Sequence, residues 1–111
     1  MEKTLKIDGK DVRFKVTGAV PMRYGQQFGT DFFKDVLKMA PLVEKKKATA
    51  KDISLIDFEV FYNIAWTFAK TADKTIPDPI EWLDLFSEFP MMDIIPELQE
   101  LLIKALPGKK K

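Results

Sequence analysis

The segment 53–73 (ISLIDFEVFYNIAWTFAKTAD) constrains the fold most, because a helix formed from it is apolar on nearly every side. One apolar stripe repeats every four residues: Ile56, Val60, Ile64, Phe68. Leu55, Tyr62 and Trp66 point well away from that stripe. A helix that is apolar all round must be buried on more than one side. We therefore expect 53–73 to be the central helix of the fold. Its second face is left either for the rest of the chain or for another subunit.

The N-terminal residues 1–17 predict a β-hairpin. Apolar residues alternate with charged ones on both sides of the Asp8-Gly9 pair, and Asp-Gly is a strong signal for a hairpin turn. The period of two places five apolar side chains on one face: Leu5, Ile7, Val12, Phe14, Val16. Because a lone two-stranded hairpin is marginally stable in water, this face is expected to lie on helices.

The segment 22–40 follows a helical period and is expected to form one helix that Pro41 ends. It contains Gly25 and Gly29, each of which costs a helix interior about 1 kcal/mol relative to Ala. Either the glycines let another backbone come close, within this chain or from a second one, or Gly25 precedes the true helix start. We expect Gly29 to permit close packing on the hairpin or the central helix, and Gly25 to mark an irregular first turn.

Two further helices are expected after a break that contains two prolines. In helix 79–89, Asp78 is placed to cap the helix and Pro79 to occupy its first position. Helix 93–106 contains Pro96, which is tolerated only in the first turn.

The chain of 111 residues is large enough for one hydrophobic core and too short for two. The elements predict a single domain over 1–107, followed by a basic tail at 108–111. The expected fold class is α+β and mainly α, with an N-terminal β-hairpin packed on a bundle of about four helices.

Composition argues against several kinds of site. The chain has no Cys and no His, which removes thiolate and imidazole metal ligands and the commonest general base. Most carboxylates, including Asp31 and Asp35, are expected on exposed helix faces. The net charge of +1 does not favour a nucleic-acid partner, and no apolar run is long enough for a membrane span. The first ten residues are charged and unlike a secretory signal. We expect a cytoplasmic protein without catalytic, cofactor or metal sites.

The C-terminal third carries more large apolar side chains than a short helix pair needs for its own cover. These residues are Trp82, Leu85, Phe86, Phe89, Met91 and Met92. Two interpretations stay open: a core corner between helices around Pro90, or a hydrophobic groove for a partner segment. Met is flexible and suits surfaces that bind varied helices, so we take these residues as the hypothetical partner-binding site.

Three stretches, taken in order, resemble the tail assembly chaperones of long-tailed phages and prophages of Gram-positive bacteria. They are IDGKDVRFKVTGAVPMRYGQQFGTDFFKD, FEVFYNIAWTFAKTADKTIPDPIEWLDLF and IIPELQELL. The likeness covers nearly the whole chain and lies in order and spacing, because none of the stretches is a chemical motif. Gly29 fits the family pattern, whereas Gly25 stands where a long polar residue is more usual.

The resemblance implies a non-enzymatic role in the cytoplasm of the bacterial host. Such proteins bind the tape measure protein, a long and largely apolar helical chain, keep it soluble during tail assembly, and are absent from the virion. The tail tube protein and further copies of the chain are additional candidate partners. Many of these proteins also have a longer form made by ribosomal frameshifting. The Lys109–Lys111 run is compatible with a slippery codon run for that event or with a plain solubilising tail. The alternative function is a structural tail component, such as a completion or connector protein, that stays in the virion.

Overall fold

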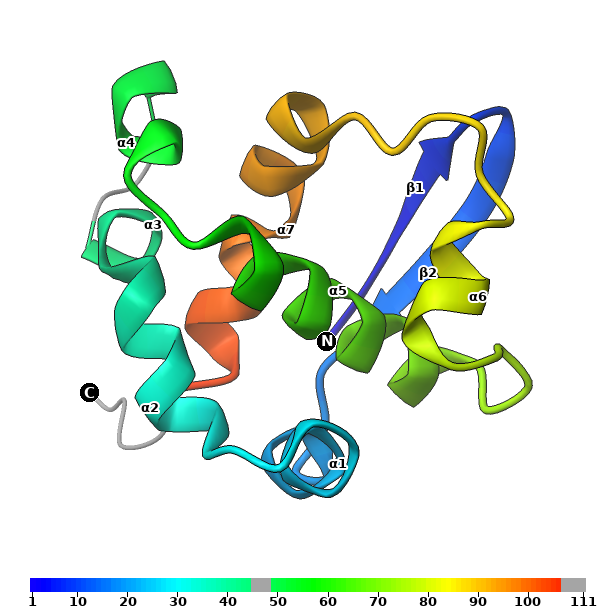
Figure 1. The fold of residues 1–111 in the computed structure, drawn as a ribbon, viewed down its shortest axis with the longest axis horizontal. Coiled ribbons are helices and arrows are strands. Elements are labelled where there is room, and N and C mark those ends of the chain that lie inside the picture. Colours follow the sequence, from blue (N-terminus) through cyan, green and yellow to red (C-terminus); the bar gives the residue numbers. More distant parts are fainter. Residues whose placement is uncertain (45–48, 107–111) are drawn as a thin grey trace.

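The computed structural model describes residues 1–44 and 49–106, and it shows a mainly helical α+β fold with an N-terminal hairpin, as predicted (Figure 1). The predicted basic tail and its Lys109–Lys111 run lie outside the described residues. The elements, in chain order, are β1 (Glu2–Ile7), β2 (Lys10–Lys15), α1 (Val20–Phe28), α2 (Phe32–Val36), the 3₁₀ helix η1 (Leu37–Met39), α3 (Ala40–Glu44), α4 (Ala50–Ser54), α5 (Phe58–Ala72), α6 (Pro79–Leu83) and α7 (Met91–Lys104).

The hairpin forms as its sequence predicts. Asp8 and Gly9 both adopt left-handed backbone angles, with φ of 54° and 75°, as a two-residue type I′ turn requires. The antiparallel register pairs Leu5 with Val12. Ile7, Val12 and Phe14 are buried on the inner face, so the apolar alternation is confirmed.

Helix α5 is the central element, also as predicted, and it crosses the middle of the molecule between β2 and α1 (Figure 1). Nine of its side chains are buried, and the indole Nε1 of Trp66 donates a 2.9 Å hydrogen bond to the carbonyl of Pro77. The predicted boundaries 53–73 were wrong at the N-terminal side. Asp57 caps α5 by accepting a hydrogen bond from the Val60 amide, so Ile53 belongs to the separate helix α4.

The predicted helix 22–40 is broken into several pieces. Gly29 ends α1 in the left-handed conformation (φ 72°), and the Asp31 carboxylate caps α2 by accepting a 2.8 Å hydrogen bond from the Phe33 amide. A C-terminal glycine and an N-terminal carboxylate stop one helix and start the next, although the apolar period runs through both. Pro41 lies in the first turn of α3, where its missing N–H is harmless, and so does not end a helix.

The expectation that the two glycines serve close packing was wrong. A Cβ built on Gly29 meets no atom within 4 Å, and one built on Gly25 meets only the Thr30 carbonyl oxygen at 3.6 Å, an ordinary contact. Gly25 lies inside α1 and does not mark an irregular first turn. What Gly29 supplies is the left-handed backbone at the helix end.

The two C-terminal helices also differ from their predicted boundaries. Helix α6 ends at Leu83, well short of 89, and Asp78 takes the cap position without a hydrogen bond from its side chain. Pro79 is the first residue of α6, as predicted. Helix α7 begins at Met91, which puts Pro96 inside the helix and beyond its first turn. There Pro96 cannot donate to the carbonyl of Met92, four residues earlier.

Helix α7 flanks the first strand of the hairpin. Lys3, on the inner face of β1, forms a 3.2 Å ion pair with Glu97 of α7. None of the helices in the described ranges is both long and apolar enough to cross a membrane.

The two glycines form a matched test of this account. Gly25→Ala places a methyl group in a helix interior with only ordinary contacts, so we expect it to stabilise the fold by about 0.5–1 kcal/mol. Gly29→Ala puts a side chain into the left-handed region and should destabilise by about 1–2 kcal/mol. Urea unfolding measures both changes. A Gly29→Ala variant that is as stable as the wild type, or more stable, would contradict the assignment of Gly29 as the left-handed helix cap.

Candidate functional site

The aromatic side chains of the predicted partner site lie mainly in the core. Trp82 is buried and packs edge-on against Phe14 of the hairpin, with ring centroids 6.5 Å apart. Its ring also contacts Phe86 and Phe89 at 5.5 and 5.6 Å. Tyr62 of α5 contacts Phe89 at 5.7 Å. This ring cluster joins α6 and the following loop to the hairpin and to α5, so the rings of Trp82 and Phe86 are largely buried in the core.

The other members of the predicted site are at or near the surface. Leu85 and Met92 are 54% and 53% exposed, whereas Phe89 and Met91 are half-buried. The structure therefore divides the six residues into two buried, two half-buried and two exposed positions. Leu85 lies just after α6 and Met92 lies at the start of α7.

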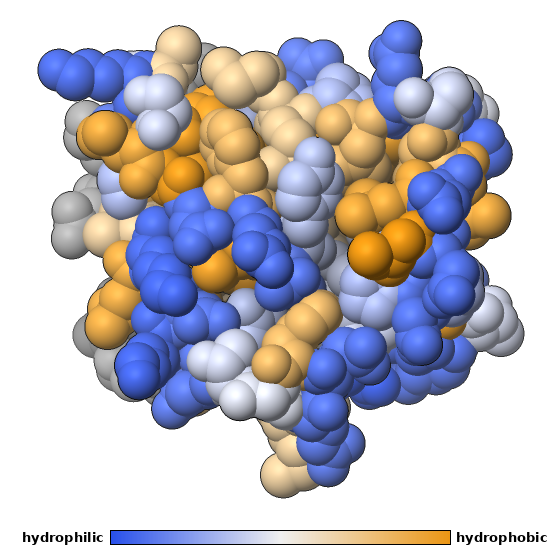
Figure 2. Space-filling model, viewed as in Figure 1, coloured by the Kyte–Doolittle hydropathy of each residue, from blue (hydrophilic) through white to orange (hydrophobic). Residues whose placement is uncertain are grey.

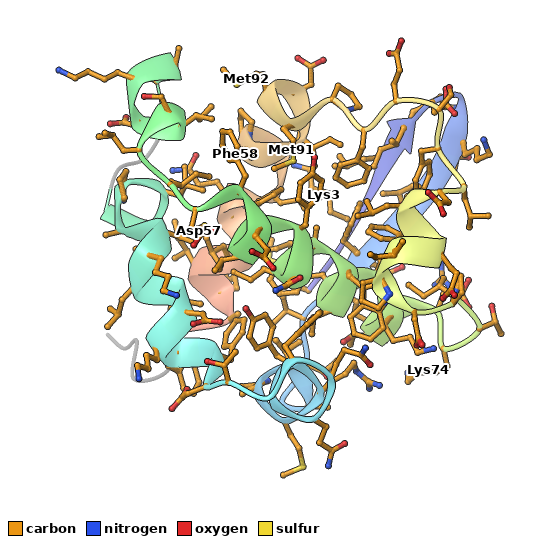
Figure 3. All side chains as sticks on the ribbon, in the orientation of Figure 1. Lys3, Asp57, Phe58, Lys74, Met91 and Met92 are labelled. Carbon is orange, nitrogen blue, oxygen red and sulfur yellow. The ribbon has the colours of Figure 1, made fainter. Side chains whose placement is uncertain are left out.

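Large apolar side chains are also exposed at the first residues of α5 and α7. Phe58, the first residue of α5, is 43% exposed, and in the view of Figure 3 it projects close to Met91 and Met92, the first residues of α7. We call these three residues the methionine patch. Leu55, on the turn before α5, is 65% exposed, and hydrophobic surface spreads over this upper part of the molecule (Figure 2). Sequence reasoning missed Phe58, because the helix 53–73 was expected to be buried on more than one side.

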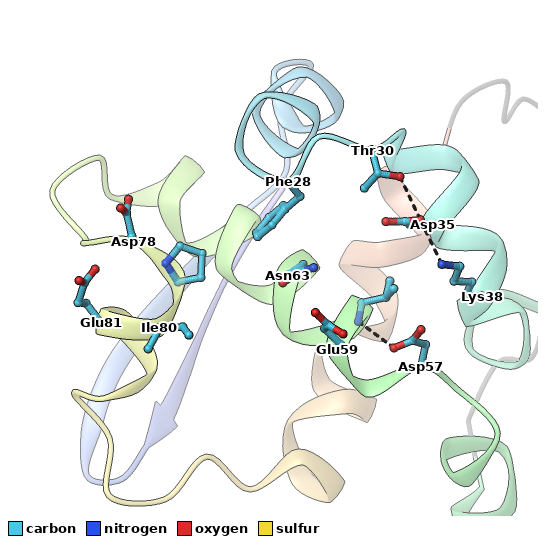
Figure 4. Close-up of a pocket in the computed structure, with 12 residues that line it drawn as sticks. Phe28, Thr30, Asp35, Lys38, Asp57, Glu59, Asn63, Asp78, Ile80 and Glu81 are labelled. Carbon is cyan, nitrogen blue, oxygen red and sulfur yellow. Dashed lines mark hydrogen bonds and ion pairs between the residues drawn. The ribbon is translucent and has the colours of Figure 1, made fainter.

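A polar groove of about 720 Å³ opens between the α1–α2 connection, α5 and α6 (Figure 4). Five carboxylates line it: Asp35, Asp57, Glu59, Asp78, Glu81. The ammonium nitrogen of Lys38 lies 3.6 Å from a carboxylate oxygen of Asp35. On the opposite wall lies the exposed side chain of Ile80. The groove is thus lined by more acidic than basic side chains, with Ile80 as its most exposed apolar residue.

The buried carboxylate in this groove was missed by sequence reasoning. Asp35 was expected on the surface, but it is only 5% exposed and accepts a 2.8 Å hydrogen bond from the Tyr24 hydroxyl. Thr30 donates a second, longer one. Asp35 lies three residues after the buried Phe32, and this helical spacing was the available signal. The pair ties α1 to α2 across the break at Gly29.

The chemistry of the Tyr24–Asp35 pair is that of a structural contact. Burial raises the pKa of the Tyr24 hydroxyl above its ordinary value, and the hydrogen bond and negative charge of Asp35 raise that pKa further. Within the described residues, every buried polar side-chain atom has a hydrogen-bond partner. The same part of the chain brings no three His, Cys, Asp or Glu side chains together as metal ligands.

The chain matches no family model, no curated protein and no solved structure. Among the described residues, the methionine patch and the two grooves beside α6 are surfaces that can receive another molecule.

The hydroxyl of Tyr24 can be tested by removing it. Tyr24→Phe keeps the ring but takes a donor from a buried carboxylate, which should cost about 2 kcal/mol of unfolding free energy. Tyr62→Phe is the matched control, because the Tyr62 ring is half-buried and its packing on Phe89 is kept. Its change should stay below about 0.5 kcal/mol. Similar losses of unfolding free energy in both variants, measured by urea unfolding, would contradict a stabilising role of the Tyr24–Asp35 hydrogen bond.

The raised pKa of Tyr24 also predicts a pH dependence. Above pH 10.0, the ordinary tyrosine pKa, the unfolded chain loses this proton while the folded chain keeps it. The unfolded state then binds fewer protons, so the free energy of unfolding falls as the pH rises. Tyr24→Phe should reduce the steepness of this fall relative to the wild type and to Tyr62→Phe. If the free energy of unfolding falls equally steeply with pH in all three proteins, the raised pKa of Tyr24 is not the cause of the fall.

Proposed function

We propose that this protein is a non-enzymatic phage tail assembly chaperone that binds the tape measure protein and keeps it soluble in the host cytoplasm. The order of three long stretches resembling that family motivates the proposal. The observation that carries it is the methionine patch, where Phe58 and Met92 are about half exposed on a small domain.

The methionine patch suits an apolar helical partner for physical reasons. Met side chains are unbranched and polarizable, so they adapt to the differing side chains along a long helix. Exposed apolar groups gathered at one place on a domain commonly mark a binding surface. The patch lies at the start of α5 and α7, so it rests on two of the longest helices of the fold.

Binding through such a patch is reversible. Few groups are buried at once, and no covalent step is involved, so the partner can be released when the tail tube forms around it. This fits a factor that acts during assembly and then leaves. The tail tube protein and a second copy of the chain remain candidate partners under the same proposal.

Co-expression with a tagged tape measure protein tests the proposal. We expect the wild type to keep the tape measure protein in the soluble fraction and to co-purify with it. The double variant Phe58→Asp with Met92→Asp should lose both effects, because charges on the patch oppose apolar contact. The double variant Met22→Asp with Leu37→Asp is the matched control, since both residues are exposed on other helices.

Two outcomes would contradict the proposal. The first is a tape measure protein that precipitates in the presence of the wild-type chain. The second is this chain found in purified virions, which would favour the alternative of a structural tail component. Thermal unfolding of both double variants checks that they are folded.

A further inference from the structure

The outer edge of the hairpin carries unpaired backbone groups. Met1 and Val16 exchange backbone hydrogen bonds, with the Val16 N–H 2.9 Å from the Met1 carbonyl oxygen. In an antiparallel pair, hydrogen-bonded and non-hydrogen-bonded residue pairs alternate. The register therefore makes alternate residues of β2 hydrogen-bond to β1 through their backbone groups: Phe14, Val12 and Lys10. The N–H and C=O groups of Asp11 and Arg13 point away from β1. Within the described residues, no backbone bond to another segment involves these two amides.

A groove runs along this open edge. Four consecutive residues of β2, Lys10 to Arg13, form one wall of a cavity of about 260 Å³. The opposite wall is mostly apolar and comes from the end of α5, from α6 and from their flanking loops: Ala69, Ile76, Trp82, Leu85, Phe86. Leu85 is more than half exposed, so the groove is open to solvent along that wall.

The ends of the groove are held by contacts across it. At the end next to the turn, the Lys10 ammonium lies 5.8 Å from the centre of the Phe86 ring, and the Asp8 carboxylate accepts hydrogen bonds from the amide and hydroxyl of Ser87. At the other end, the Arg13 guanidinium donates a 3.0 Å hydrogen bond to the Ala72 carbonyl. These contacts fix the spacing between the strand edge and the apolar wall.

We propose that this groove binds an extended peptide segment of a partner protein, which adds a third strand beside β2. An open strand edge supplies main-chain hydrogen bonds, and the adjacent apolar wall receives every second side chain of the added strand. The chemistry of the occupant follows: a β-forming segment with apolar residues at alternate positions. The charged groups around the groove, Lys10, Asp11, Arg13 and Asp73, balance each other, so the segment needs no net charge.

A second copy of this chain does not fit the same place through its own β2. The hairpin of a second copy carries its α5 beneath its inner face, as here. In this molecule, the space next to the open edge on the inner-face side is occupied by α6, whose Trp82 packs on Phe14. The α5 of a second copy would have to enter the same space. A single strand has no such layer beneath it. This inference goes beyond the chaperone proposal, since the site is separate from the methionine patch and takes an extended rather than a helical segment.

Hydrogen exchange of the free protein tests the open edge directly. The amides of Asp11 and Arg13 should exchange rapidly, whereas those of Val12 and Phe14, which bond to β1, should be protected. Equal protection of all four amides would overturn the proposal.

Peptide selection tests the occupant without the tape measure protein, so its failure is distinguishable from failure of the chaperone proposal. The probe is a displayed library of random octapeptides, selected on the wild type and counter-selected on Leu85→Asp. We expect enriched peptides with alternating apolar residues, which slow exchange at Asp11 and Arg13. Their affinity should fall about tenfold or more in Leu85→Asp.

Ile80→Asp is the matched control, because Ile80 lies on α6 but lines the other groove. It should leave the affinity nearly unchanged. Peptides N-methylated at alternate residues, which cannot pair with the strand edge, should bind poorly. The proposal is overturned if no peptide is enriched, if N-methylated peptides bind equally well, or if Ile80→Asp weakens binding as much as Leu85→Asp. Thermal unfolding confirms that both variants are folded.

Discussion

The central interaction of the fold is the burial of α5 by the hairpin on one side and by α1 on another, with α6 also packed on it. Polar contacts along α5 reinforce this packing. Arg23 of α1 donates a 3.2 Å hydrogen bond to the Thr71 hydroxyl, and Arg13 of the hairpin reaches the Ala72 carbonyl at the end of the helix. Trp66 holds the loop before α6 through the Pro77 carbonyl. Because α5 is apolar nearly all round, removing any one of these neighbours exposes a large hydrophobic surface.

The same arrangement explains why the two proposed binding surfaces lie at the ends of helices. The helices around α5 are mostly short, so each covers a limited part of the core and leaves its own ends near the surface. At the starts of α5 and α7, this leaves Phe58 and Met92 exposed. Beside α6, which has only five residues, it leaves an open groove along the edge of β2. The methionine patch and the groove are thus separate consequences of packing mostly short elements around α5.

The parts of the fold that could be predicted are those where local chemistry and apolar period agree. The Asp8-Gly9 turn between alternating strands, and the all-round apolar character of α5, each point to a single structure. The segment 22–40 was mispredicted because its apolar period continues through a helix end. Gly29 and Asp31 carry the real signal there, as a left-handed C-cap followed by an N-cap, and this local chemistry outweighs periodicity.

The candidate sites were harder to predict for a different reason. Periodicity shows that a helix has apolar faces, but it does not show which face a neighbour covers. Trp82 and Phe86 are covered by the hairpin, while Leu85 and Met92 remain exposed, and only the tertiary packing distinguishes them. Asp35 is buried because Tyr24, on another helix, donates to it. The groove beside β2 depends on the position of α6 against the strand edge, which no single segment encodes.

The most direct test of the central claim is site-specific photo-crosslinking during tail assembly. A photoreactive amino acid is placed at Phe58, in the methionine patch, or at Met22, which is at least as exposed but lies on α1. We predict that the Phe58 position crosslinks to the tape measure protein and that the Met22 position does not. Equal crosslinking from both positions, or none from Phe58, would contradict the assignment of the methionine patch as the binding surface.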